Sequence, residues 1–405
     1  MNVLFVCEGF NRDSVVAQPW KHIYELSIRM KNLGHEVTVL TDLSDNLSEN
    51  EFINGISICR IEKGLFFFKF DKLINTLNDN RWDIINWVGG PLSALYFSRL
   101  RQSVRKKFVW TMYKGKLTFD DFKNLGVFEL ISLLKDVQFI YSIVPDFFVR
   151  RGSNYSNVDS IVVWSKRLKK YLADIGVNQN KISIVSSGVD TESFRPISET
   201  DTVILKEKLG FRSEETLVLY FGSLSSFRGL DVLISAMNKV AKKNVKLKLL
   251  VLAREKDTSI TNKLLELVNK QIYTRVVAGI LSQSEVIQFL SIADIVALPF
   301  KSWPHQEVPL TVLEAMSMGK IVISTNIWPI LDYIEDGKTG ILVSPNNVDR
   351  LAEKIIEVLL NQKEYVEIGN SACSYVKECH DWNIILKRTL EIFQNSERIV
   401  DDSQH

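Results

Sequence analysis

The sequence lacks two features that direct a chain into or across a membrane. None of its apolar runs approaches the roughly 20 residues that a membrane-spanning helix needs. Its first residues, "MNVLFVCEGF", are too short for a signal peptide and carry no basic segment before the apolar run. They are more typical of a buried strand. We therefore expect a cytoplasmic protein.

Cysteine and histidine are both scarce. The four cysteines, at positions 7, 59, 373 and 379, are scattered and match no zinc-binding spacing, so we expect reduced thiols and no metal site. The five histidines provide poorly for acid–base catalysis. The net charge of +2 gives no overall field that would favour nucleic acid as a partner.

Basic residues are nevertheless concentrated in two places. Segment 99–119 carries seven Lys or Arg and no Asp or Glu, and "KRLKK" follows at 166–170. A solvated helix face is the simpler interpretation. The alternative is peripheral association with an anionic membrane at the inner face of the cell membrane, which would suit a lipid-linked acceptor.

At 405 residues, with 46% hydrophobic and 24% charged residues, the chain is expected to form two globular domains. Apolar runs typical of buried strands alternate with helical patterns, which indicates parallel sheets covered on both faces. The polar, Gly- and Pro-containing segment 186–201 interrupts this alternation. We predict domains at 1–190 and 191–380 and a last amphipathic helix at 381–394. The predicted strands are 2–6, 35–41, 83–88, 107–113, 160–165, 216–222, 247–253, 274–279, 294–300, 320–325 and 339–345.

The stretch "YFGSLSSFRGLDVLISAM" (220–237) predicts a strand, a short polar loop and a helix that opens at Gly229. The N-terminus of a helix offers unpaired N–H groups and the positive end of a dipole to a phosphate. Arg228, directly before the helix, can add a bidentate contact to a diphosphate. The alternative is an ordinary strand-to-helix crossover with a surface arginine.

A second loop of this kind ends in "VPLTVLEAMSMG" (308–319). Pro309 suits the first helical turn, and the N–H groups around Leu310 and Thr311 would suit an anion. Glu314 lies one turn further on the same face. Its apolar neighbours predict partial burial, which a carboxylate tolerates only with partners, and a ribose diol would provide them. An exposed helical glutamate is the alternative.

These stretches resemble the retaining glycosyltransferases of family 4, also described as glycosyl transferases group 1, over nearly the whole chain. The resemblance implies a GT-B fold: an α/β architecture of two doubly wound, Rossmann-like domains that face each other across a cleft. It also implies that the last helix, 381–400, packs back on the N-terminal domain. The motifs that carry it are "LGHEVTVLT" (33–41), "SSGVDTESFRP" (186–196), "FGSLSSFRGLDVLISA" (221–236), "VPLTVLEAMSMGKIVIST" (308–325) and "YIEDGKTGILVSP" (333–345).

Family members transfer a sugar from a nucleoside-diphosphate sugar to an acceptor, with retention of anomeric configuration and without a metal ion. By resemblance, the C-terminal domain holds the donor and the N-terminal domain holds a carbohydrate or lipid-linked acceptor. Arg228 takes the position of the family's diphosphate-binding lysine, whereas Ser223 stands where an arginine is usual. Glu314 matches the ribose-binding glutamate. The family's other glutamate falls on Gln306, and the adjacent Glu307 could replace it only if the loop shifts by one residue.

The N-terminal motifs of the family are less complete. The glycine-rich loop after the first strand is reduced to Gly9, and Tyr113 stands at the position of the usual histidine. Asp332 takes the position of an acidic residue in a later segment. Gln306 keeps hydrogen-bonding capacity toward a sugar hydroxyl, so we expect a change of sugar preference rather than loss of donor binding.

Three functions remain open from the sequence. The first is an active glycosyltransferase that builds a polysaccharide, a glycolipid or a protein glycan. The second is a degenerate GT-B protein that binds a nucleotide or a partner enzyme without turnover, which the missing histidine and glycines favour. The third is a hydrolysing epimerase, for which no histidine or carboxylate placement supplies the acid–base pair. Arg228 and Glu314 favour the first.

Overall fold

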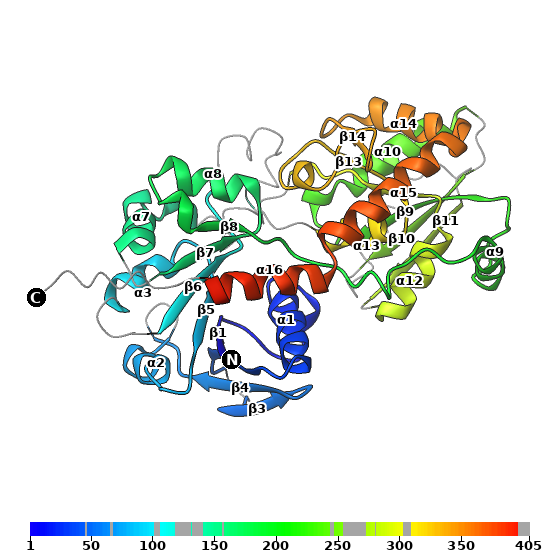
Figure 1. The fold of residues 1–405 in the computed structure, drawn as a ribbon. Helices are drawn as coiled ribbons and strands as arrows, with labels where there is room; N and C mark the ends of the chain where they lie inside the picture. The colour runs from blue at the N-terminus through cyan, green and yellow to red at the C-terminus, as the bar shows by residue number, and fades with distance from the viewer. Residues whose placement is uncertain are drawn as a thin grey trace, which may run out of the picture.

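A computed structural model describes residues 1–44, 47–64, 68–100, 106–117, 131, 141–155, 158–243, 247–253, 273–279, 281–302 and 309–395. Two sheets carry the architecture, and they lie in the two halves of the chain (Figure 1). Among the described residues, no helix is long and apolar enough to cross a membrane.

The N-terminal sheet has eight strands in the order β3-β4-β2-β1-β5-β6-β7-β8. All pairs are parallel except β3 with β4, which form an antiparallel hairpin. Residues on both faces of β1 and β5 are buried, as expected for a parallel sheet between helices. The strands are β1 (Asn2–Val6), β2 (Glu36–Asp42), β3 (Asn50–Ile53), β4 (Ile56–Ile61), β5 (Ile84–Val88), β6 (Lys107–Met112), β7 (Ser160–Val163) and β8 (Ile182–Ile184).

Helices connect these strands, and their ends follow the capping signals of the sequence. Gly34 lies just beyond α1 with a φ of +82°, the left-handed conformation that glycine adopts without strain. Ser165 caps α8 by accepting a hydrogen bond from the backbone N–H of Leu168 at 3.1 Å. The helices of this half are α1 (Trp20–Asn32), α2 (Phe70–Leu77), α3 (Ser93–Leu100), α7 (Asp146–Tyr155) and α8 (Lys166–Asp174), with short 3-10 turns at η1 (Ser14–Val16) and η2 (Gln179–Lys181).

The C-terminal sheet has six parallel strands in the order β11-β10-β9-β12-β13-β14. The strands are β9 (Thr216–Gly222), β10 (Leu247–Ala253), β11 (Tyr273–Ala278), β12 (Ile295–Leu298), β13 (Ile321–Thr325) and β14 (Ile341–Val343). The helices are α9 (Glu199–Lys208), α10 (Leu230–Ala241), α12 (Gln283–Ile292), α13 (Leu310–Ser317), α14 (Val348–Leu360) and α15 (Gln362–Cys379), with 3-10 turns at η3 (Ser226–Arg228) and η4 (Ile330–Asp332).

The last helix, α16 (Trp382–Asn395), packs on the N-terminal half beside α1 (Figure 1). Trp382, Ile385 and Phe393 are buried in the same apolar cluster as Val3 and Phe5 of β1. The chain therefore crosses between the halves twice, once through residues 185–198 and once before α16. The two crossings pair directly, because the backbone N–H of Val189 donates to the carbonyl of His380 at 2.9 Å.

The structure differs from the sequence predictions in three local respects. The β3–β4 hairpin and the short edge strand β8 were not predicted. The helix expected to open at Gly229 begins at Leu230, and Gly229 is its N-cap residue, in a left-handed conformation with a φ of +71°. Pro309 is the N-cap residue of α13 and lies directly before its first helical turn.

Candidate active site

A cavity of about 350 Å³ lies between the two halves of the molecule. Its C-terminal wall comes from the carboxyl ends of neighbouring strands, with Phe221 in β9, Ala253 at the end of β10 and Gly279 just after β11. Its N-terminal wall comes from η1 and the first turns of α1. Ligands of open α/β sheets bind at this edge. The remaining lining residues are Val15, Val16, Lys21, Tyr24, Glu25, Phe194, Leu252, Leu281, Gln283, Val286 and Glu314.

Helix α13 presents two buried polar side chains with unmet hydrogen-bonding capacity. Glu314, which lines the cavity, is 5% exposed, and its Oε2 atom accepts no hydrogen bond from the described residues. Thr311, one turn earlier, is 1% exposed, and its Oγ1 atom likewise has no partner in the described part of the chain. Burying such atoms without partners costs free energy, so they are typical of a ligand-binding site. Burial of Glu314 rules out the exposed-glutamate alternative.

Among the residues that the structure describes, the cation beside Glu314 comes from the opposite domain. Lys21, in the first turn of α1, places its Nζ atom 3.7 Å from Oε1 of Glu314. The distance is long for an ion pair, and the carboxylate is far more buried than the ammonium group. This contact links the two walls of the cavity across the cleft. No pattern in the sequence identified Lys21, because its partner lies almost 300 residues away on the other domain.

Arg228 lies in the loop between β9 and α10, at the end of η3, and is 8% exposed. Its guanidinium carbon is 5.5 Å from the centre of the Phe300 ring. It also packs on Gly222 at the end of β9, where an added Cβ would come within 3.1 Å of that carbon. Arg228 is therefore held beside Gly222, the residue that follows Phe221 in β9. It is not a surface arginine, which removes the simpler interpretation of this loop.

The loop that holds Arg228 and the loop after β12 lie against each other. The backbone N–H of Lys301 donates to the carbonyl of Phe227 at 2.8 Å, and Gly229 approaches Pro299 too closely to admit a side chain. The N-termini of α10 and α13 follow these two loops. Ser223, half-buried, begins the first loop and accepts a 2.7 Å hydrogen bond from Tyr220 through its carbonyl oxygen.

The predicted diphosphate ligands fall on these two loops and helix starts. Ser223, Arg228 and Gly229 belong to the first, whereas Pro309, Leu310 and Thr311 belong to the second. Gln306 and Glu307, the predicted sugar-facing residues, lie outside the described residues, so their placement stays a prediction.

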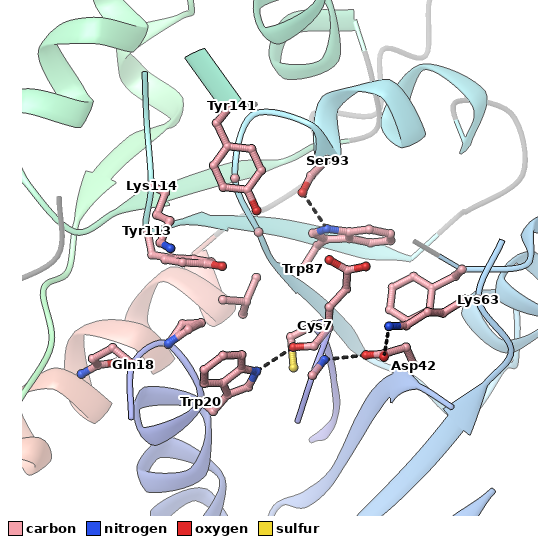
Figure 2. A pocket seen from close by; sticks show the side chains of 17 residues that line it. Cys7, Gln18, Trp20, Asp42, Lys63, Trp87, Ser93, Tyr113, Lys114 and Tyr141 are labelled. Atoms are coloured by element: carbon pink, nitrogen blue, oxygen red, sulfur yellow. Dashed lines mark hydrogen bonds and ion pairs between the residues drawn. The ribbon is translucent and has the colours of Figure 1, made fainter. Parts of the chain in front are cut away.

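A second cavity, of about 290 Å³, lies within the N-terminal half (Figure 2). It opens at the carboxyl ends of four adjacent strands, β2, β1, β5 and β6. The predicted acceptor-side residues Gly9 and Tyr113 both line it. Gly9 has a φ of +71°, and an added Cβ would come within 3.2 Å of the Trp20 ring.

Tyr113 is placed by the aromatic side chain of Trp164, with ring centres 5.5 Å apart. Two residues of the C-terminal half form hydrogen bonds to the N-terminal half close to Trp164. The hydroxyl group of Tyr333 donates to the carbonyl of Trp164 at 3.3 Å, and Asp332 accepts a 2.9 Å hydrogen bond from the backbone N–H of Lys166. Burial raises the pKa of the Asp332 carboxyl. Asp332 therefore contacts the start of α8 in the opposite domain.

Two carboxyl groups of the N-terminal cavity have opposite environments. Asp42 accepts a hydrogen bond from the backbone N–H of Gly9 and pairs with Lys63 at 3.1 Å. Burial works against the ionised form of Asp42, but the Gly9 and Lys63 contacts hold its pKa below the ordinary value. Glu8 also lines the cavity. Its burial, with the Asp42 charge nearby, raises the pKa of Glu8 to about 7.

The sequence reasoning missed Glu8. The signal available was a carboxylate directly after a buried parallel strand, at the edge where ligands bind. No group of three or more His, Cys, Asp or Glu among the described residues is arranged to hold a metal ion.

Comparison with known proteins agrees with this architecture. The family described as "Glycosyl transferases group 1" matches residues 201–374, and "Glycosyltransferase Family 4" matches residues 20–193. Among solved structures, sucrose-phosphate synthase from Thermosynechococcus elongatus superposes with a TM-score of 0.74 at 17% identity, over 97% of this chain and 98% of that one. Anabaena HepE in complex with UDP gives a TM-score of 0.75 at 15% identity, over 96% and 99%. These likenesses establish the GT-B fold.

Sequence relatives are glycosyltransferases as well. An uncharacterised glycosyltransferase of Methanocaldococcus jannaschii is 24% identical over 89% of this chain and 90% of its own length. A GDP-mannose-dependent monoacylated alpha-(1-6)-phosphatidylinositol monomannoside mannosyltransferase of Corynebacterium glutamicum is 26% identical over 52% of this chain and 56% of its own. A lipopolysaccharide 1,2-N-acetylglucosaminetransferase of Salmonella typhimurium is 26% identical over 59% and 63%. The two family matches together span both domains, and the chain belongs to the group 1 glycosyltransferases of family 4, enzymes of the GT-B fold.

Proposed function

We propose that the protein transfers a hexose-type sugar from a nucleoside-diphosphate sugar to a hydroxyl group of a glycan, glycolipid or protein-glycan acceptor. The transfer would retain the anomeric configuration and need no metal ion. The observation that carries the proposal is the buried carboxylate of Glu314, which lines the interdomain cavity and has one oxygen atom without a hydrogen-bond partner among the described residues. A ribose diol supplies the donors that this oxygen lacks.

The donor would fit the interdomain site in one orientation. Its ribose would lie on Glu314, with the base against the apolar wall that includes Phe221, Leu252 and Ala253. Its diphosphate would then point toward the N-termini of α10 and α13 and toward Arg228. Lys21 would exchange its contact with Glu314 for the donor, and its charge would replace part of what the arginine missing at Ser223 would supply.

The chain's own contribution to the reaction is electrostatic. As the bond to the sugar breaks, negative charge accumulates on the leaving diphosphate, and Arg228 with the two helix N-termini stabilises that charge. The leaving oxygen would take the proton of the attacking hydroxyl group on the same face, which gives retention. The N-terminal cavity would hold the acceptor, and the crossings at 185–198 and before α16 allow the domains to close.

Peripheral association with the cytoplasmic face of an anionic membrane forms part of the proposal. Ile143, which precedes α7, and Phe147 and Phe148 in its first turn are exposed. Arg150 and Arg151 follow on the same helix. Exposed aromatic residues beside basic ones favour an anionic lipid surface. Residues 101–105 and 118–119 of the basic segment lie outside the described residues. Flotation with vesicles containing anionic lipid tests this part, and an absence of binding at low salt would overturn it.

The names of two relatives support a lipid-linked or glycan acceptor, because one acts on a phosphatidylinositol mannoside and the other on lipopolysaccharide. A UDP-bound solved structure of the same fold supports a nucleotide donor. The alternative is a protein that binds a nucleotide or a partner enzyme without turnover. Tyr113 in place of the usual histidine, and a glycine-rich loop reduced to Gly9, favour that alternative.

A panel of UDP-, GDP- and TDP-sugars, scored by thermal shift and by donor hydrolysis, tests the proposed function. We expect one nucleotide series to raise the unfolding temperature and one of its sugars to be released or transferred. Stabilisation without turnover on any acceptor pool would favour the binding-only alternative. No stabilisation by any member would overturn both.

A further inference from the structure

The N-terminal cavity contains a carboxyl group that the proposed reaction does not use. Glu8 follows β1 and lines the cavity, and no side chain or backbone group of the described residues donates a hydrogen bond to its carboxylate. Its neighbour Asp42 differs, because the Gly9 N–H and Lys63 already satisfy it. Glu8 is therefore the carboxylate of this cavity that has hydrogen-bonding capacity left for a ligand.

The walls around Glu8 are aromatic, and the indole N–H groups in them already donate hydrogen bonds within the protein. The indole N–H of Trp20 donates to the backbone carbonyl of Glu8 at 2.6 Å, and that of Trp87 donates to Ser93 Oγ at 3.0 Å. These bonds fix the two indole rings at the cavity wall (Figure 2). Tyr141 stands across the cavity in the same view. Aromatic walls around a few placed polar groups are typical of small-molecule sites.

The size and the opening of the cavity restrict what can enter. Its volume of about 290 Å³ is at the lower end of the range for ligand pockets, which suits one ring and not an oligosaccharide. Gly89 and Gly90 form part of the wall after β5, and a Cβ on Gly90 would collide with the Tyr141 ring at 2.8 Å. The space beside Tyr141 therefore depends on glycine at this position.

We propose that this cavity binds one uncharged sugar or polyol ring, the ring of the acceptor, and that Glu8 selects it by accepting hydrogen bonds from two neighbouring ring hydroxyl groups. The role of the ring as an acceptor rests on the proposed function, whereas its binding does not. Glu8 acts as a specificity-determining residue, and the proton of the reacting hydroxyl still leaves with the diphosphate. An anionic ring is excluded because its carboxylate would face that of Glu8.

The proposal predicts a pH dependence. Besides Glu8, the charged and titratable groups of the cavity are Asp42, Lys63, Lys114, Cys7 and the tyrosines 113 and 141. Burial and Asp42 raise the pKa of Glu8 to about 7, and Lys63 opposes them. Because the ionised carboxylate is the better acceptor for two hydroxyl groups, binding strengthens as pH rises from 6 to 8.

Ligand-observed saturation-transfer NMR on the full chain tests both the binding of a ring and its pH dependence. The probes are the methyl pyranosides of glucose, galactose and mannose, with methyl glucuronide as the anionic counterpart. We expect at least one neutral probe to bind at pH 8, more weakly at pH 6, and the glucuronide not to bind. Glu8→Gln should weaken binding of that probe about tenfold at pH 8 and remove the pH dependence. Glu36→Gln, at an exposed position of β2, is the matched control and should change neither the affinity for the probe nor its pH dependence.

Absence of binding by all three neutral probes would overturn the proposal, as would equal binding by wild type and Glu8→Gln. Binding of the glucuronide as tightly as the neutral probes would also overturn it. The nucleotide panel separates this result from the proposed function, because the nucleotide uses the interdomain cavity. If a neutral ring binds but no nucleotide of the panel does, the assignment of the N-terminal cavity stands and the proposed transfer reaction is overturned.

Discussion

The two cavities lie at matching edges of the two sheets, yet they are built from different parts of the chain. The predicted donor ligands are a buried arginine, two helix starts and one buried carboxylate, all within two strand–loop–helix units of the C-terminal half. The carboxylate, Glu314, lines the interdomain cavity, and η1 and α1 of the N-terminal half form the opposite wall. The N-terminal cavity depends on side chains from the ends of four strands, which are spread over the first 140 residues.

This difference reflects what each ligand would require. A diphosphate carries concentrated charge, and helix N-termini with an arginine can stabilise it almost independently of the other side chains. A ring of hydroxyl groups carries no charge, so its recognition needs individually placed acceptors and aromatic surfaces. The donor side is therefore local in sequence, and the acceptor side is assembled by the fold.

Removing the guanidinium from the donor side should have the largest effect. Arg228→Ala is expected to lower kcat/KM by about 100- to 1000-fold, since charge on the leaving group loses a preorganised partner. Initial rates with the donor chosen from the nucleotide panel provide the measurement. Arg228→Lys keeps a charge at this position and should recover part of the activity. An alanine variant with unchanged rates and an unchanged unfolding temperature would remove Arg228 from the site.

Replacement of Glu314 should lower the affinity for the nucleotide without lowering the unfolding temperature of the protein alone. Glu314→Leu is expected to abolish the thermal shift produced by the nucleotide, a loss of about 30-fold or more in affinity. The unfolding temperature without nucleotide should stay equal or rise, because a buried and poorly paired charge is removed. Calorimetric unfolding with and without nucleotide measures both. A large destabilisation with nucleotide binding retained would assign Glu314 a structural role only.

Lys21 tests whether the N-terminal domain contributes to the donor site. Lys21→Met keeps the apolar stem and removes the charge, and we expect nucleoside-diphosphate affinity to fall about tenfold. Lys31→Met, in the last turn of the same helix, is the matched control and should leave the affinity unchanged. Equal affinities for the Lys21 variant and wild type would confine the donor site to the C-terminal domain.

The smallest expected effect is a pH-dependent change in the free energy of unfolding when Glu8 of the N-terminal cavity is replaced. The pKa of Glu8 is raised to about 7 in the folded protein, so the folded state holds a proton that the unfolded chain releases near pH 4.5. The cost to folding therefore grows as pH rises from 4.5 to 7 and is constant above that. Glu8→Gln should match wild type at pH 4 and be more stable by about 1 kcal/mol at pH 8, after allowance for partial solvent exposure. Urea unfolding at several pH values measures this, and a difference that does not change with pH would contradict it.

The strands of both sheets that have long apolar runs were predictable, because burial on both faces leaves a continuous run without polar interruption. The hairpin β3–β4 was not, since Asn50 to Ile53 is an edge segment with alternating exposure, and pairing there depends on contacts with β4. Strand β8 has three residues and gives no periodic signal. The resemblance to a known family, and not the periodicity, indicated that the last helix returns to the N-terminal domain.

The candidate site divides in the same way. Arg228, Gly229 and Glu314 could be identified because each lies at a fixed position after a strand or within a helix. Burial of Glu314 was predictable from its apolar neighbours. Lys21 and Glu8 could not be assigned, because the first depends on how the domains face each other and the second on which four strand ends meet.

Glu314 is the residue that we propose binds the ribose of a nucleotide in the interdomain cavity. Calorimetric titration of UDP, GDP and TDP into wild type, Glu314→Gln and the exposed control Glu353→Gln tests it most directly. We predict that one of the three nucleotides binds wild type and the control equally and binds Glu314→Gln about tenfold or more weakly. Equal binding to all three proteins, or binding to none, would contradict the account.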